Sequence, residues 1–147
     1  MDELSIRICS DEDLYLLAGL NEQLIEDEQH DNQMNVEQLK ARMHHFLHTE
    51  YKAYLFENGD QVIGYALVKH TDRPLYLRHF FIGRESRRKG FGKSAFRKLL
   101  QALDTDQIDI EVLYWNKAAY SFWSSLGFKE RSVAMRLENG HEKSTQT

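Results

Sequence analysis

The sequence contains little that would support a disulfide, a membrane span or a secretory signal. Cys9 is the only cysteine among the 147 residues, so no disulfide can form within the chain. This composition suits a reducing compartment, and the alternating run LSIRI-C favours a buried structural thiol at Cys9. No stretch approaches the roughly 18 consecutive apolar residues of a membrane span, and the acidic start MDELSIRICSDEDL lacks the order of a secretory signal. We therefore expect a cytoplasmic protein with no membrane partner.

Proline is almost absent, and no segment rich in serine, glycine or proline divides the chain. Pro74 is the only proline, and the sequence shows neither an internal repeat nor a low-complexity segment. The length is close to that of a typical single domain, and 41% hydrophobic with 29% charged residues is ordinary for a globular protein. We therefore predict one domain over residues 1–147, with residues 139–147 as a frayed polar tail.

The net charge of −4 hides an uneven distribution of acidic and basic residues. Residues 1–31 hold ten acidic side chains and one basic, whereas residues 84–98 hold seven basic side chains and one acidic. Each run alone is typical of a solvated helix face. Together they suggest an anionic ligand at one place and a cationic ligand at another.

Hydrophobic periodicity predicts an order of strands and helices. Strands are expected over residues 4–8, 52–57, 61–69, 75–82, 107–113 and 128–137, and helices over 11–28, 36–48, 88–103 and 116–126. The dipeptide Asn58-Gly59 predicts a two-residue hairpin turn. The order β-α-α-β-β-β-α-β-α-β predicts an α+β or α/β fold in which one layer of sheet is flanked by helices.

A glycine-containing basic loop, residues 87–93 (RRKGFGK), lies between the apolar strand end FFI and an amphipathic helix. The first-turn N–H groups of a helix lack intrahelical acceptors, and the helix dipole adds partial positive charge, so phosphate oxygens bind well there. Gly90 and Gly92 let the backbone approach a ligand closely, and the basic side chains add charge-assisted hydrogen bonds. The spacing fits neither G-x-G-x-x-G nor the P-loop, and a glycine pair alone is also typical of a plain turn.

Two motifs in order resemble those of the GNAT superfamily of N-acetyltransferases. Arg87-x-x-Gly90-x-Gly92 is similar to the acyl-CoA-binding motif of that family. NKAAYSFWSSLGF is similar to its second signature, N-x-x-A-x-x-[LF]-[YF]-x-x-x-G-F, and the matching residues are Asn116, Ala119, Phe122, Leu126, Gly127 and Phe128. The resemblance spans about residues 50–137. It implies the GNAT fold, with a mixed, mostly antiparallel central sheet.

The resemblance implies that acetyl-CoA lies in a V-shaped opening between strands 75–82 and 107–113. Backbone groups of Phe80, Phe81 and Ile82 would pair with the pantetheine arm, and a backbone N–H there would polarise the thioester carbonyl. Adjacent strand residues face opposite sides. One of the two phenylalanine rings should therefore lie in the core, and the other under a helix or facing the cleft.

The resemblance also implies which residues hold the rest of the cofactor. The pyrophosphate would bind the loop residues, which are Arg87, Arg88, Lys89, Gly90, Phe91, Gly92 and Lys93. Asn116 would cap its helix and touch the pantetheine. Tyr120 and Trp123 share a helix face with Asn116, so both would also line the cofactor site.

The implied reaction is direct attack of a primary amine on the thioester in a ternary complex. Such chemistry needs a base for the ammonium and an acid for the leaving thiolate. Many family members have a tyrosine where this sequence has Trp123, and an indole cannot donate a proton near neutral pH. Tyr120 is therefore the candidate acid, with an ordinary semi-buried aromatic as the alternative. His79 and Glu111 are candidate bases, with a core or surface histidine as the alternative for His79.

The resemblance places the acceptor against the N-terminal helices and their loop, here NEQLIEDEQHDNQ. Glu26 and Glu28 belong to an acidic stretch that would attract a small cationic amine or a peptide amine. A solvated acidic helix face is the alternative. Arg78 could instead bind an acceptor carboxylate if it faces the cleft, and the sequence does not choose between these. Arg78 and His79 are expected to face opposite sides of the strand.

No metal and no nucleic acid are expected as partners. His44, His45 and His48 carry no recognisable carboxylate or cysteine partner in the sequence, and they are typical of solvent-facing helix residues. The acidic net charge argues against a nucleic-acid-binding domain that uses residues 84–98. A catalytically impaired acyl-CoA-binding module and an interaction protein without a ligand remain alternatives. The sequence is compatible with a homodimer.

Overall fold

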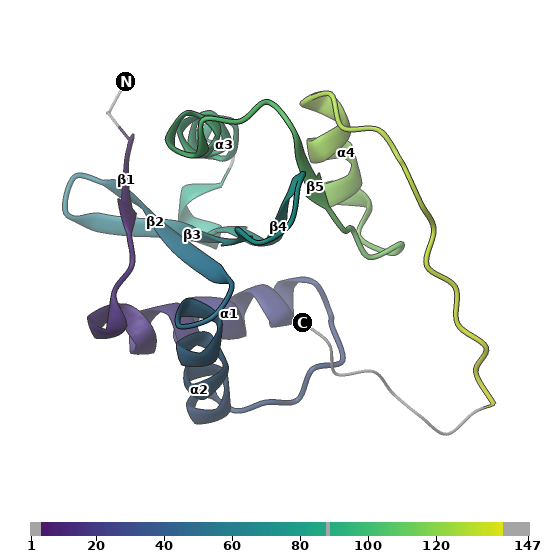
Figure 1. Cartoon of the computed structure of the whole chain (residues 1–147), viewed down its shortest axis with the longest axis horizontal. Helices are drawn as coiled ribbons and strands as arrows, with labels where there is room; N and C mark the ends of the chain where they lie inside the picture. Colours follow the sequence, from purple (N-terminus) through teal and green to yellow (C-terminus); the bar gives the residue numbers. More distant parts are fainter. Residues whose placement is uncertain (1–3, 88, 140–147) are drawn as a thin grey trace.

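Alternating apolar residues form the strands of the computed structural model, which describes residues 4–87 and 89–139. The strands are β1 Leu4–Ile8, β2 Tyr51–Asn58, β3 Gln61–Lys69, β4 Leu75–Ile82 and β5 Ile108–Ile110. The helices are α1 Leu14–Asp27, α2 Val36–Leu47, α3 Phe91–Leu103 and α4 Lys117–Ser125, with 3₁₀ turns η1 Asp11–Asp13 and η2 Arg84–Ser86 (Figure 1). In the described part of the chain, no helix is long and apolar enough to cross a bilayer.

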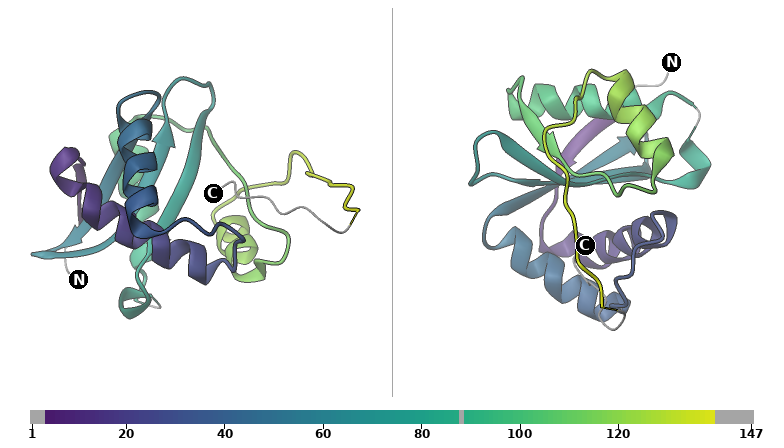
Figure 2. Two further views of the ribbon diagram at one scale, coloured as in Figure 1. Left: turned by 90° about the horizontal axis from the view of Figure 1, so that it is seen from below. Right: turned by 90° about the vertical axis from the view of Figure 1, so that its right-hand side faces the viewer.

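The strands form one sheet in the order β1-β2-β3-β4-β5. The pairs from β1 to β4 are antiparallel, and β4 pairs with β5 in parallel. Figure 2 shows α1 and α2 on one face of this sheet and α3 and α4 on the other. The expected α+β class, with a mixed and mostly antiparallel sheet between helices, is therefore confirmed.

Each face of the sheet carries its own hydrophobic core. On the side of α3 and α4, Phe56, Val68 and Leu77 pack with Leu99 and Trp123. On the opposite side the core is built by helix residues Leu14, Leu17, Leu24 and Met43 and by the alternate strand residues Ala53, Leu55, Tyr65, Leu67 and Phe81. This alternation follows from the period of two in a strand buried on both faces.

The β2–β3 hairpin turns at Gly59 and Asp60. Asn58 still pairs with Gln61, so the two-residue loop lies one position later than the dipeptide Asn58-Gly59 predicts. Gly59 has φ of +63°. Glycine adopts that conformation without the strain that a side chain would bring.

The strands β4 and β5 part soon after they meet. Their pairing covers only Leu75 to Leu77 against Ile108 to Ile110, so the rest of β4 has no strand partner on that side among the described residues. β4 also contains a bulge, because Leu67 pairs with His79 and the next residue, Val68, pairs with Leu77. Arg78 is the extra residue of this bulge. The predicted strand over residues 107–113 is thus shorter than expected, and an opening results where it ends.

The expected strand over residues 128–137 is wrong. These residues form no strand, and the segment runs away from the body of the molecule in Figure 1. Its alternating apolar side chains are left in solvent, with Val133, Met135 and Leu137 exposed by 75%, 92% and 88%. The alternating pattern would give a strand one apolar face, but these side chains pack against no other element in the described part of the chain. Residues 140–147 of the expected tail lie outside the described residues.

Candidate functional site

The parting of β4 and β5 leaves residues 80–82 without a strand partner on one side among the described residues. The side chains of this stretch alternate as the strand period requires. Phe80 packs against Phe122 and Trp123 on the side of α3 and α4, whereas Phe81 is 2% exposed in the core beneath α1 and α2. The backbone between them is thereby held from both faces.

The glycine-containing loop ends where α3 begins. Gly90 is the N-cap residue of α3 and has φ of +78°. A Cβ at Gly90 would meet no atom within 4 Å, so space lies open in front of this turn. The amides of the first turn, from Phe91 onward, point out of the helix without intrahelical acceptors. This arrangement is suited to an anionic group such as a phosphate.

Gly92 has a different role from Gly90. A Cβ on Gly92 would lie 3.1 Å from Cε1 and 3.3 Å from Cζ of the Phe122 ring. The absence of a side chain therefore lets the start of α3 pack closely against α4. Phe91 is 8% exposed and belongs to the same core, so its ring anchors the helix start. Lys89 and Lys93 are exposed beside it, and Arg88 lies outside the described residues.

Two arginines of the basic segment bind one carboxylate at the end of α1. Arg84 donates from Nε to Oδ1 of Asp27 at 3.0 Å, and Nη2 of Arg87 donates to Oδ2 of the same residue. Arg87 also donates from Nε to the carbonyl oxygen of Ile82 at 2.7 Å. Burial opposes ionisation of Asp27, but the hydrogen bonds from Arg87 and Arg84 outweigh it and lower the pKa of Asp27. The loop is thereby tied to both α1 and the end of β4.

The signature helix α4 uses its residues in three different ways. The side chain of Asn116 accepts a hydrogen bond from the amide of Ala119 at 3.1 Å and caps the helix. Tyr120 is 48% exposed, and its hydroxyl donates to Glu130 at 2.6 Å. Trp123 is 8% exposed and packs within an aromatic cluster, whose other rings are Phe80, Phe96, Phe122 and Phe128.

The bulge in β4 places Arg78 and His79 on the same face of the sheet, not on opposite faces as the strand period predicts. His79 is 2% exposed, and its Nδ1 lies 3.0 Å from the Tyr65 hydroxyl. Arg78 is half-buried on that side and donates to the Tyr51 hydroxyl at 3.3 Å. Burial, together with the charges of nearby arginines, lowers the pKa of His79 well below its ordinary value. The ring is therefore neutral near pH 7.

Glu28 lies at the end of α1 and is half-buried. Its backbone carbonyl accepts a hydrogen bond at 2.8 Å from the indole nitrogen of Trp115, which stands between β5 and α4. Burial, and to a lesser extent the charge of Asp27, raises the pKa of Glu28 to about 7. Glu26, also expected on the acceptor side, is exposed. Glu111, a candidate base, accepts a hydrogen bond from the Tyr76 hydroxyl at 3.1 Å.

The sequence did not reveal that Asp11 stands beside His44 and His48. The Nε2 of His48 lies 2.8 Å from Oδ1 of Asp11, and the two histidine rings stack at 4.2 Å. All three residues are exposed, and their ligand atoms lie within 4.8 Å of one another. Exposed groups of this kind are common without a metal, and the absence of a metal partner stays a prediction.

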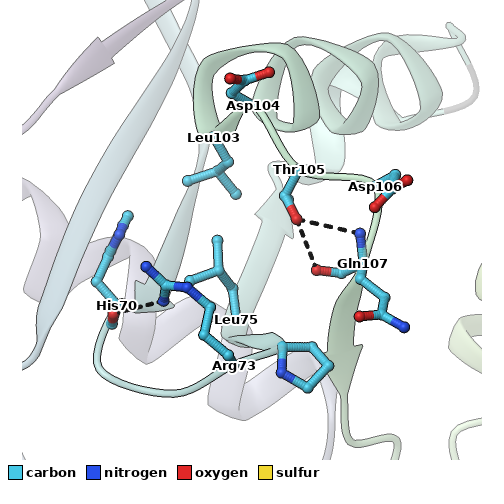
Figure 3. A pocket seen from close by; sticks show the side chains of 9 residues that line it. His70, Arg73, Leu75, Leu103, Asp104, Thr105, Asp106 and Gln107 are labelled. Carbon is cyan, nitrogen blue, oxygen red and sulfur yellow. Dashed lines mark hydrogen bonds between the residues drawn. The ribbon is translucent and has the colours of Figure 1, made fainter.

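A surface hollow of about 380 Å³ lies at the other end of the β4–β5 pair (Figure 3). It is lined by His70, Arg73, Leu75 and Leu103, and by polar residues of the turn after α3. Leu75 belongs to the part of β4 that pairs with β5. The hollow is therefore separated from the opening and from the glycine loop.

Comparison with known proteins gives one family and many similar folds. The profile of the family described as "Acetyltransferase (GNAT) domain" matches residues 9–142. No curated protein sequence matches the chain. A chain from Clostridium difficile 630 described as a possible acetyltransferase superposes with a TM-score of 0.76 at 18% identity, covering 95% of this chain and 99% of that one.

Two further solved structures share the fold at low identity. Aminoglycoside N-acetyltransferase AAC(6')-Iy in complex with CoA has a TM-score of 0.70 at 15% identity, covering 96% of this chain and 97% of that one. Ribosomal-protein-alanine N-acetyltransferase from Brucella melitensis biovar Abortus 2308 has a TM-score of 0.68 at 10% identity, covering 92% of this chain and 98% of that one. At such identities the likeness concerns the fold alone.

Proposed function

The chain belongs to the GNAT acetyltransferase family, and we propose that it transfers the acetyl group of acetyl-CoA to a primary amine in a ternary complex. The observation that carries this proposal is the opening where β4 and β5 part after Leu77 and Ile110, with the α3 start at Gly90 further along the chain from β4. The opening offers unpaired backbone for an extended ligand arm, and the helix start offers amides for phosphates.

The described residues fit acetyl-CoA in two respects. The open space before Gly90 leaves room for a pyrophosphate on the first-turn amides of Phe91, Gly92 and Lys93, with Lys89 nearby. The backbone of residues 80–82 has no strand partner on the β5 side among the described residues, so it can pair with the pantetheine there, except at the carbonyl oxygen of Ile82, which already accepts from Nε of Arg87. We propose that Asn116 contributes through its helix cap and that Trp123 supports the site from the core. When bound, acetyl-CoA supplies an acetyl thioester, and the amine forms the new C–N bond as the C–S bond breaks.

We propose Glu28 as the general base that takes the proton of the incoming ammonium. A carboxylate with a pKa of about 7 is matched to proton transfer at neutral pH. His79 is buried and bonded to Tyr65, so it is better suited to holding position than to collecting a proton. Tyr120 remains the candidate donor to the leaving thiolate, because its hydroxyl is half-exposed on α4. Its hydrogen bond to Glu130 would have to be exchanged for that role.

Acetyl-CoA at about 100 times its Kd is expected to stabilise the fold by about 2.7 kcal/mol, or roughly 5–10 °C in melting temperature. Gly90→Val should abolish most of this shift, because it strains a backbone with φ of +78° and places a side chain in the open space. Gly59→Val is the matched control, since Gly59 also has positive φ and open space but lies in the β2–β3 turn. Equal shifts in the two variants would contradict the assignment of the loop.

Glu28→Gln is expected to lower kcat about 100-fold and to remove the rise of kcat/KM with pH around neutrality. The folded pKa of about 7 lies above the ordinary 4.5, so the stability contribution of Glu28 is present below pH 4.5 and is lost as the pH rises through 7. The Glu28→Gln protein should therefore not lose this part of its stability as the pH rises through 7, which urea unfolding at several pH values would measure. Glu22→Gln, exposed on the same helix, is the control. An unchanged pH–rate profile would remove Glu28 from the reaction.

A further inference from the structure

Two arginines contact the same aromatic ring, that of Phe46, on the side of α1 and α2. Arg42 comes from α2 and Arg78 from the bulge of β4, and both are half-buried. The Cζ atoms of Arg42 and Arg78 lie 5.4 Å and 5.0 Å from the centre of the Phe46 ring. Two positive charges are therefore gathered around one aromatic side chain.

Neither guanidinium has a carboxylate partner within the described residues. Arg42 donates from Nη2 to the amide oxygen of Asn21 at 3.0 Å, and Arg78 donates to the Tyr51 hydroxyl at 3.3 Å. The Nε atoms of both arginines are buried without a hydrogen-bond partner. Burial and the charge of Arg78 lower the pKa of Arg42 to about 10. A half-buried pair of like charges without a counterion is costly unless a ligand supplies the negative charge.

His79 adds a buried imidazole beside this pair. The side chain is 2% exposed, and its Nδ1 is engaged by Tyr65. Its Nε2 is buried without a partner. Burial, and after it the positive charges of Arg42 and Arg78, lowers the pKa of the ring, which lies on the same face of the sheet as both arginines. An anionic oxygen bound by the arginines would satisfy their N–H groups that are otherwise unpaired, and guanidinium groups match carboxylate oxygens well.

We propose that the acceptor amine carries an anionic group, of the kind found in an amino acid, and that Arg42 and Arg78 bind this group. The assignment rests on the proposed acetyl transfer at the opening. Arg78 precedes Phe80 by two residues, or about 7 Å along a strand. A small acceptor held by its carboxylate at Arg78 can therefore bring its amine to the backbone of residues 80–82.

The acidic end of α1 supports a cationic acceptor less well. Asp27 is already bound by Arg84 and Arg87. Oε1 of Glu26 lies 4.0 Å from Nη2 of Arg84. Glu28 is half-buried beside Asp27 with a pKa of about 7. A polycation would moreover be repelled by the uncompensated arginine pair.

The test compares acceptors that differ only in the anionic group. Coenzyme A release is measured with free amino acids, the corresponding amino acid amides, the decarboxylated amines, phosphoethanolamine, spermidine and an aminoglycoside. We expect amino acids to exceed their amides at least tenfold in kcat/KM, and phosphoethanolamine separates phosphate from carboxylate recognition. Turnover of spermidine or the aminoglycoside in preference to anionic amines would overturn the inference while acetyl transfer stands. Failure of every amine would instead refute the proposed function.

Arg78→Gln and Arg42→Gln should each raise KM for the preferred amino acid about 10- to 100-fold. The KM for acetyl-CoA and the turnover of the matching amide should remain nearly unchanged. Arg73→Gln is the matched control, since Arg73 is exposed and, within the described residues, donates only to the backbone carbonyls of His70 and Asp72. The melting shift with acetyl-CoA shows that each variant is folded, and Arg78→Lys keeps the charge if the glutamine variant does not fold. An equal loss with amino acid and amide would overturn the inference.

Discussion

Gly64→Ala is expected to lower the free energy of unfolding by about 3–5 kcal/mol, a large share of the roughly 5–15 kcal/mol of a typical domain. Gly64 lies in β3 opposite Ile82 of β4. A Cβ at this position would stand 2.0 Å from the carbonyl oxygen of Phe81 and 3.1 Å from Cα of Ile82. Both neighbours are backbone atoms, so the clash can be relieved only by moving β4 away from β3.

The same displacement should weaken cofactor binding, because the moved atoms belong to the stretch 80–82 that we assign to the pantetheine. Urea unfolding gives the loss of stability, and the melting shift with acetyl-CoA gives the loss of binding. Gly19→Ala is the matched control, since Gly19 lies inside α1 and nothing lies within 4 Å of its Cβ position. That variant should be stabilised by about 0.5–1 kcal/mol. If the Gly64→Ala protein were as stable as the Gly19→Ala protein, β4 could move away from β3 at little cost, and the prediction would be wrong.

Local patterns predicted most of the elements, because the period of a strand or a helix appears as a regular spacing of apolar residues along the sequence. The alternation in residues 75–82 correctly separated Phe80 from Phe81 onto opposite faces. The glycines marked the start of α3, although only Gly90 needs positive φ and Gly92 instead admits Phe122. The motif thus located the helix start and left the separate roles of its glycines to the structure.

Long-range partners could not be predicted from the sequence. Asp27 binds Arg84 and Arg87, which lie 57 and 60 residues away, and no spacing rule links such positions. The sequence leaves the acidic stretch as either a site for a cationic acceptor or a solvated helix face, whereas its central carboxylate, Asp27, is already paired. The β4 bulge is equally hidden, because one extra residue changes which face Arg78 occupies without leaving a mark in the sequence.

The expected strand over residues 128–137 also shows that long-range pairing cannot be predicted from the sequence. Val133, Met135 and Leu137 alternate as a strand with one apolar face should. A strand, however, also needs a paired neighbour, and only residues 108–110 of the predicted strand 107–113 join the sheet. The apolar face is left exposed, so periodicity predicted the pattern correctly and the pairing incorrectly.

Trp123→Ala is expected to cost about 3–5 kcal/mol of stability, because it empties the centre of an aromatic cluster. The indole is 8% exposed and lies between 4.8 and 5.3 Å from the rings of four phenylalanines, measured between ring centres. One of these is Phe80, so the loss should also loosen β4 at the opening. Trp123→Phe should cost much less, since it keeps an aromatic ring in the same space.

Trp115→Ala is the matched control for Trp123→Ala, because the chain contains two tryptophans and Trp115 is 44% exposed. It loses the hydrogen bond to the carbonyl oxygen of Glu28, which is worth about 1 kcal/mol. If Trp123 instead served the cofactor directly, its alanine variant would unfold at nearly the wild-type urea concentration and lose the melting shift with acetyl-CoA. Early unfolding with a shift retained in Trp123→Phe would identify Trp123 as the core support of the site, because the site then needs the ring and not the indole nitrogen.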